Sequence, residues 1–193
     1  MSLEKYFSKY RGNIIGRDQY FVTPYGEKKM VYADWIASGR LYKPIEDVLR
    51  KNVFPFVANT HTETSTTGAT MSYALEKALK CIKDHVGANK DDVVISSGSG
   101  MTSLVCKFQR ILGLKVHENF KDQIEINNKP VVFVTNMEHH SNQTSWLETI
   151  AEVVLMPHKE NGDVNLEKFQ DMLSEFSDRD LKIAAVTSAS NVT

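Results

Sequence analysis

The order of the apolar segments in the C-terminal half constrains the fold of this chain more than any other feature. Short apolar runs without polar alternation occur at Val131–Thr135, Val153–Pro157 and Ile183–Val186. They are separated by stretches in which apolar residues recur every three or four positions, as in NLEKFQDMLSEF. The runs are typical of strands buried on both faces, and the stretches between them of amphipathic helices. This alternation predicts an α/β fold with a parallel or mixed sheet and helices on both faces.

Similar patterns predict the elements of the N-terminal half. We expect a short initial helix, a turn at TPYGEK, a brief strand at KMVYAD and a helix at KPIEDVLRKNVF. A longer helix is predicted from Met71 to Val86, with Gly87 as its left-handed C-cap. Residues 92–96, DVVIS, are predicted to form a strand that leads through the glycine turn SSGSG into the next helix.

Charge and apolar content exclude several classes of protein. Lys and Arg total 23 and Asp and Glu total 24, a net charge of -1, so no long-range field would collect nucleic acid or an anionic membrane. No apolar run approaches the about 20 residues that span a bilayer. The N-terminus lacks the apolar stretch of a signal peptide, which favours a cytoplasmic protein. Cys81 and Cys106 lie in amphipathic helical patterns and are interpreted as small buried apolar residues.

Polar segments follow three of the predicted strands. They are SSGSG after Ile95, NMEHHSN after Val134 and SASN after Val186. The carboxyl ends of parallel strands meet at one edge of a sheet, where ligands of α/β proteins bind. The sequence therefore predicts a binding site at this edge.

The first of these segments has the features of a phosphate-binding turn. Gly98 and Gly100 allow a sharp turn, and the N–H groups of Ser99, Gly100 and Met101 would then point out of a helix N-terminus, which attracts anions. A tight strand–helix turn without a ligand is the other interpretation. A dinucleotide is disfavoured because Ser103 stands where the third glycine of that motif is needed.

The other two segments carry imidazoles and carboxamides. A His at the end of a buried strand is usually a hydrogen-bonded structural residue, but here His139 and His140 stand beside Glu138. A metal is disfavoured because adjacent residues rarely share one ion and no His-x-x-x-His or Cys-x-x-Cys spacing is present. An imidazole held over a flat aromatic cofactor is the other use. Asn191 either caps a turn or donates to a phenolate oxygen of such a cofactor.

These motifs make the chain similar to a known family. It resembles the class V aminotransferases, pyridoxal-phosphate-dependent enzymes of the aspartate aminotransferase fold, which include cysteine desulfurases and selenocysteine lyases. EHHSN followed by Trp, then ENGDVNLEKFQDML and KIAAVTSASNV, resemble the family's Glu-His-His-(Ala/Ser)-Asn, Gly-x-hydrophobic-x-Leu and Ser-Asn-Val motifs in order and spacing. The resemblance begins near Tyr32, where YADWIASGR is similar to the family's opening segment, and runs to Thr193.

The resemblance implies pyridoxal 5'-phosphate as the cofactor, an amino acid as the substrate and a homodimer as the assembly. It implies that His139 stacks on the pyridine ring as the catalytic residue and that Asn191 bonds the ring oxygen. His61 matches a His in a loop that approaches the active site, often across the dimer interface. His140 and Asn142 would lie behind these residues or near the substrate.

Ser99, Gly100 and Met101 stand at the family's phosphate turn. That turn usually has a Thr followed by an acidic residue, and Gly100 and Met101 occupy those places here, so the expected contacts are mostly with the backbone. The resemblance also implies an N-terminal segment over residues 1–60 and a partial cofactor-binding large domain over residues 61–193.

Members of the family are much longer than this chain, which ends within the last motif. We therefore expect a truncated N-terminal fragment that lacks the Schiff-base lysine and is inactive by itself. Desulfurase, selenocysteine lyase and aminotransferase activities all remain open. The alternative is a non-catalytic truncated α/β module with a residual phosphate-binding loop, and a third hypothesis is a nucleotide-binding α/β protein of another class.

Overall fold

A computed structural model describes residues 2–98, 100–190 and 192 of the chain. Its contacts divide it into two compact units, Met1–Val94 and Ile95–Thr193, called here the first and second unit. A domain boundary was predicted after residue 60. That boundary refers to the domains of complete family members, and it stays a prediction. Among the described residues, no helix combines the length and the apolar character needed to cross a membrane.

The first unit is built from helices and one short hairpin. Its elements are α1 (Leu3–Arg11), the antiparallel strands β1 (Tyr20–Thr23) and β2 (Gly26–Lys29), α2 (Lys43–Val48), the π-helical η1 (Leu49–Val53), the 3-10 turn η2 (Phe54–Phe56) and α3 (Thr66–His85). The short initial helix and the helix that begins near Pro44 are confirmed. The strand predicted at residues 29–34 is wrong. The strands flank the expected turn, because the backbone groups of Tyr20–Thr23 pair with Gly26–Lys29.

The end of α3 matches its sequence signal, whereas Cys81 in the same helix is exposed and not buried as predicted. Gly87 has φ 69°, and its N–H donates to the Asp84 carbonyl at 3.3 Å. The N–H of Ala88 donates to the Lys83 carbonyl at 2.9 Å, which completes the bond pattern of a Schellman motif. The predicted left-handed C-cap at Gly87 is confirmed, since a glycine adopts positive φ without a steric cost from Cβ.

The second unit contains a three-stranded parallel sheet. Strand β3 (Val131–Val134) lies between β4 (Glu152–Leu155) and β5 (Lys182–Ala185). The helices of the unit are α4 (Met101–Ile111), the 3-10 helix η3 (Glu118–Gln123), α5 (His140–Leu147) and α6 (Leu166–Glu175). The predicted α/β class with a parallel sheet is confirmed.

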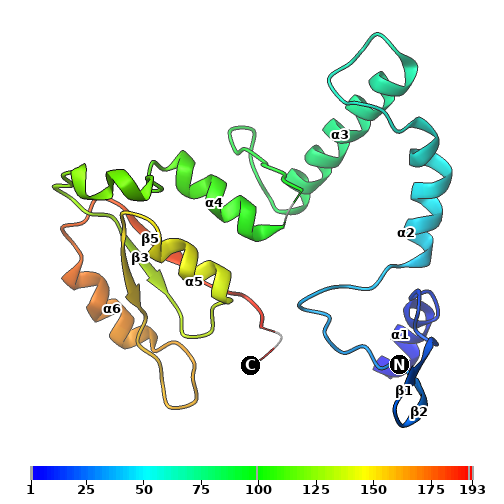
Figure 1. The fold of residues 1–193 in the computed structure, drawn as a ribbon, viewed down its shortest axis with the longest axis horizontal. Coiled ribbons are helices and arrows are strands. Elements are labelled where there is room, and N and C mark those ends of the chain that lie inside the picture. The colour runs from blue at the N-terminus through cyan, green and yellow to red at the C-terminus, as the bar shows by residue number, and fades with distance from the viewer. Residues whose placement is uncertain (1, 99, 191, 193) are drawn as a thin grey trace. The chain divides into compact units, whose positions relative to one another are not determined.

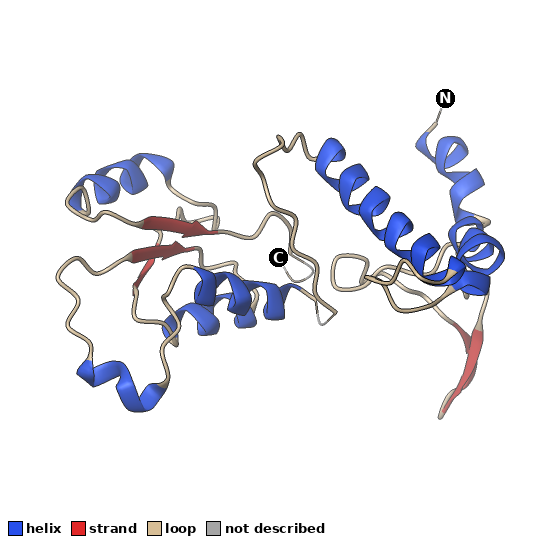
Figure 2. Ribbon diagram, turned by 90° about the horizontal axis from the view of Figure 1, so that it is seen from above, coloured by secondary structure: helices blue, strands red, loops and turns tan. Residues whose placement is uncertain are grey.

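The alternation of side chains along β3 fills both faces of the sheet. Val132 and Val134 pack in one cluster with Trp146 of α5, and Val131 and Phe133 in another with apolar residues of α6. Phe133 meets Phe169 edge to face, with ring centroids 5.2 Å apart. Each fully buried side chain of this size contributes about 1.5–3 kcal/mol to stability. Helices therefore cover both faces of the sheet, as Figures 1 and 2 show.

The strand predicted at residues 92–96 is wrong. These residues form no strand, and Val93 is 81% exposed. A strand requires a neighbour whose backbone groups complete the ladder, and among the described residues no strand pairs with this segment. The apolar pattern indicates a tendency to form a strand, but it does not supply that neighbour.

Candidate functional site

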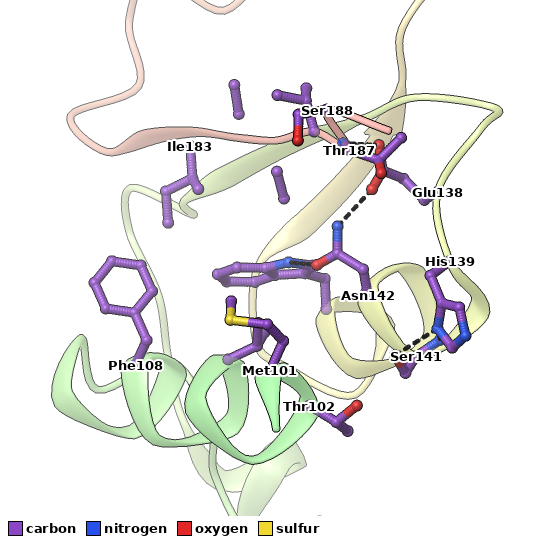
Figure 3. Close-up of a pocket in the computed structure, with 15 residues that line it drawn as sticks. Met101, Thr102, Phe108, Glu138, His139, Ser141, Asn142, Ile183, Thr187 and Ser188 are labelled. Atoms are coloured by element: carbon purple, nitrogen blue, oxygen red, sulfur yellow. Dashed lines mark hydrogen bonds between the residues drawn. The ribbon is translucent and has the colours of Figure 1, made fainter. Parts of the chain in front are cut away.

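A pocket of about 610 Å³ lies at the carboxyl edge of the sheet in the second unit. Its walls come from one side of α4, the turn after β3, helix α5, and β5 with residues 186–188. Figure 3 shows Phe108 and Ile183 on the side of the pocket opposite His139. The pocket thus has a polar rim and an apolar wall, as small-molecule sites commonly do.

The glycine turn places the start of α4 at this pocket. Gly100 is the N-cap residue, with φ 75° and ψ -169°, and no side chain caps the first turn among the residues described. Met101 and Thr102 line the pocket. An uncapped helix N-terminus carries partial positive charge and free N–H groups, which suit a phosphate. Ser99, the first residue of the predicted phosphate turn, lies outside the described residues.

A serine hydroxyl holds this turn from within the helix. Ser103 Oγ donates to the Gly100 carbonyl at 2.9 Å, and Ser97 Oγ lies 3.2 Å from Ser103 Oγ. Ser103, which takes the place of the third glycine in a dinucleotide motif, therefore serves the backbone of the turn.

His139 is the N-cap residue of α5 and lines the pocket. The N–H of Ser141 donates to His139 Nδ1 at 3.2 Å, and Ser141 Oγ lies 2.8 Å from the same nitrogen. Because Nδ1 accepts, the proton of a neutral ring is on Nε2. The ring is exposed at the rim, as Figure 3 shows. Its stacking on a cofactor stays a prediction.

The remaining predicted site residues differ in whether they line the pocket. Asn142 lines the pocket, whereas His140, the exposed first residue of α5, does not. His61 belongs to the first unit, where its φ is 68° and its N–H donates to Ser72 Oγ at 3.0 Å. Its approach to the active site stays a prediction. Asn191 lies outside the described residues, so its predicted role also stays open.

Glu138 is the member of the rim for which the sequence indicated no separate role. Oε1 accepts from the Thr135 hydroxyl at 2.6 Å and from the Thr187 N–H at 2.9 Å. Oε2 accepts from Asn142 Nδ2 at 2.7 Å. Its place beside the two histidines marked Glu138 as a rim residue, but no sequence signal pointed to Thr187, which lies 49 positions away.

Asn142 connects this hydrogen-bond network to the core. Its Oδ1 accepts from Trp146 Nε1 at 3.1 Å, and the Trp146 side chain is buried against the sheet. Both hydrogen-bonding ends of the carboxamide are therefore used. In the sequence, Trp146 was recognised as the Trp that follows EHHSN in the family motif, whereas in the structure its indole N–H also orients a pocket residue.

The chemistry available here is that of binding and orienting a ligand. One part of the rim offers a helix N-terminus, another an imidazole whose Nε2 has no hydrogen-bond partner among the described residues, and the facing wall is apolar. Within the described part of the chain, no group of three or more His, Cys, Asp or Glu side chains could hold a metal ion. An anionic ligand with a flat ring matches this combination of surfaces.

Comparisons with known proteins indicate the family and the fold of the chain. The profile of the class V aminotransferases matches residues 31–193. The apo structure of a cysteine desulfurase from Thermococcus onnurineus NA1 superposes with a TM-score of 0.66 and 16% identity over 99% of this chain. A kynurenine aminotransferase from Pyrococcus horikoshii gives a TM-score of 0.42 and 15% identity over 96% of this chain and 39% of its own. A search of curated proteins gave no match. The chain spans 41% of the length of the desulfurase.

Proposed function

The chain belongs to the class V aminotransferase family, and from this premise we propose that its pocket holds pyridoxal 5'-phosphate for a reaction on an amino acid. The single observation that carries the proposal is the convergence of the uncapped α4 N-terminus and the His139 ring on one pocket. The two features lie far apart in the sequence, and each matches one half of the cofactor.

The start of α4 would hold the phosphate. Gly100 and Met101 bring no hydroxyl or charged group, so the contacts come from backbone N–H groups and the helix dipole. Thr102, which lines the pocket, is the nearby side chain with a hydroxyl to add. Ser99 completes the proposed turn.

The ring of His139 would lie against the pyridine ring. Its hydrogen bonds to Ser141 fix both the tautomer and the direction of the imidazole plane, so the ring is orientated before a ligand arrives. Asn191 would donate to the ring oxygen, and His61 and Asn142 would lie near the substrate. His140, which does not line the pocket, would support α5.

When bound, pyridoxal phosphate supplies an electron sink for negative charge at a substrate carbon. No lysine is found among the described residues that line the pocket. We infer that this chain holds the cofactor by non-covalent contacts and that turnover requires a lysine from outside this pocket. A homodimer and a cytoplasmic location are further parts of the proposal.

Titration of the chain with pyridoxamine 5'-phosphate tests the proposal. This form has no aldehyde, so it cannot react with the surface lysines. We expect saturable binding that His139→Ala weakens by about tenfold, the equivalent of about 1.4 kcal/mol of lost ring contact. His140→Ala is the matched control, since it removes an imidazole that does not line the pocket, and its affinity should equal that of the parent chain. Equal affinity in the His139→Ala variant would reject the role of His139.

The same titration separates the alternatives. If inorganic phosphate binds as tightly as pyridoxamine 5'-phosphate, the pocket recognises only the anion, and a non-catalytic module is the better description. If ATP binds and the pyridoxamine compound does not, a nucleotide-binding protein of another class is indicated. Binding of the cofactor above both competitors supports the proposed function.

A further inference from the structure

The Glu138 carboxylate joins three segments of the pocket wall. Thr135 follows β3, Asn142 belongs to α5, and Thr187 follows β5, and each donates to Glu138 at 2.6–2.9 Å. The proposed cofactor contacts of His139 and the α4 N-terminus make no use of this carboxylate. Figure 3 shows Glu138 between Thr187 and Asn142, away from the Phe108 side of the pocket.

The Trp146 indole, at one end of this network, fixes which groups donate and which accept. The indole N–H of Trp146 is only a donor, so it holds the oxygen of the Asn142 carboxamide. The amide nitrogen of Asn142 must then face Glu138, where it donates to Oε2. The other oxygen faces two more donors, one of them the backbone N–H of Thr187.

This polarity requires a group at position 138 that accepts on both of its atoms. A carboxylate satisfies it. A glutamine of the same shape would turn its own NH₂ group toward a donor in either orientation, toward Asn142 in one and toward Thr187 in the other. Facing donors leave a part-buried polar group without a partner, which costs about 1–3 kcal/mol.

We propose that Glu138 is a positioning residue that fixes the Asn142 carboxamide and docks the segment after β5 against the turn that carries His139. Through Glu138 and Asn142, the indole N–H of Trp146 fixes the positions of two walls of the pocket. This inference rests on the proposed function for the identity of the ligand that those walls meet.

The contact network can be tested without any ligand by amide and indole hydrogen exchange, measured by NMR in the 193-residue chain. In Glu138→Gln, the Thr187 amide, the Trp146 indole N–H or both should exchange about tenfold faster, because glutamine can accept on only one of its two sides. The indole of Trp35 serves as an internal reference. Unchanged exchange at both Thr187 and Trp146 would overturn the proposal.

Glu148→Gln is the matched control. It makes the same chemical change just after α5, where the Glu148 carboxylate is exposed and contacts Lys115 at 2.8 Å. That hydrogen bond lowers the pKa of Glu148, but it does not reach the pocket. Exchange at Thr187 and Trp146 should therefore equal that of the parent chain. Faster exchange in this control too would show a general loosening and contradict the specific role of Glu138.

Rescue by a second substitution separates polarity from mere loss of charge. Trp146→Phe removes the donor that orientates Asn142, so in a double variant with Glu138→Gln the carboxamide can turn and offer its oxygen to the amide introduced at position 138. The Thr187 amide in the double variant should exchange at the rate found for Trp146→Phe alone. Additive effects would overturn the polarity argument. If Glu138→Gln does not fold, recovery of folding in the double variant supports the proposal, and failure of both contradicts it.

Affinity for pyridoxamine 5'-phosphate tests the link to the ligand. Glu138→Gln should weaken it by about tenfold, and the double variant should match Trp146→Phe. If the parent chain does not bind the compound while the exchange pattern is as expected, the proposed function fails and the positioning role stands. If exchange rises while the affinity of Glu138→Gln equals that of the parent chain, Glu138 does not position the ligand walls.

Discussion

At the scale of single residues, the two glycines of the SSGSG turn have different tasks. Gly100 combines φ 75° with ψ -169°, a region of backbone space that is almost restricted to glycine. Gly98 has no positive φ, and at both positions the described residues leave open space where the Cβ of another residue would lie. The requirement at Gly100 is therefore one of backbone conformation and not of space.

This difference gives a paired prediction. Gly100→Ala should lower the free energy of unfolding by about 1–3 kcal/mol, because alanine is strained in that region. Gly98→Ala should be neutral or stabilise by up to about 1 kcal/mol through the lower entropy of the unfolded chain. Urea unfolding followed by circular dichroism measures both. A loss of stability in Gly98→Ala as large as in Gly100→Ala would show that space, and not φ, limits the turn.

At the scale of elements, a buried amide joins α4 and α5. Gln109 of α4 is fully buried, and its Nε2 donates to Ser145 Oγ at 3.1 Å. Its Oε1 has no partner among the described residues. Ser145 Oγ in turn donates to the Asn142 carbonyl at 3.0 Å. The contact between the helices thus contains one satisfied and one unsatisfied polar end of the same side chain.

An apolar side chain of similar length should suit this position at least as well. Gln109→Met is expected to keep the stability of the parent chain or to raise it by up to about 1 kcal/mol, since it removes an unpaired buried oxygen. Ser145→Ala should cost about 1–3 kcal/mol, because it leaves Gln109 Nε2 unpaired. The cost of Ser145→Ala should shrink in the Gln109→Met background. A large loss of stability in Gln109→Met would show that the unpaired oxygen does not destabilise the folded chain.

At the scale of the whole molecule, the core is concentrated in one unit. Among the described residues, every buried apolar side chain lies at position 114 or later. In the first unit, large apolar side chains such as Val22, Tyr25 and Val31 are more than 80% exposed. Since buried apolar area is the main source of stability, the two units should differ in their ability to fold alone.

We therefore expect residues 95–193 to fold as an independent unit and residues 1–94 to remain without cooperative structure. The pocket residues all belong to the former, so its NMR signals should superimpose on those of the whole chain, that of the Trp146 indole included. Spectra of the two separate pieces and of the whole chain make the comparison. If the NMR signals of residues 95–193 lost their chemical-shift dispersion, the piece would be unfolded. That result would contradict the expectation and show that the sheet depends on the first unit.

Local patterns in the sequence were sufficient to predict the class of the fold and most of its helices. The amphipathic periods, the left-handed glycine after α3 and the unbroken apolar runs of β3 and β5 depend on neighbours a few positions apart, so they can be recognised in the sequence. The position of His139 at the rim could be predicted in the same way, because it lies in the short polar segment that follows β3.

The tertiary structure alone decided which backbone groups found partners. Residues 92–96 contain an apolar run like that of β3 but pair with no strand among the described residues, and Tyr20–Thr23 form a hairpin although KMVYAD was the predicted strand. The bond from Thr187 to Glu138 joins positions 49 residues apart. A local pattern reports the preference of a segment, whereas a ladder or a hydrogen-bond network requires a second segment in the right place, and only the packed molecule supplies it.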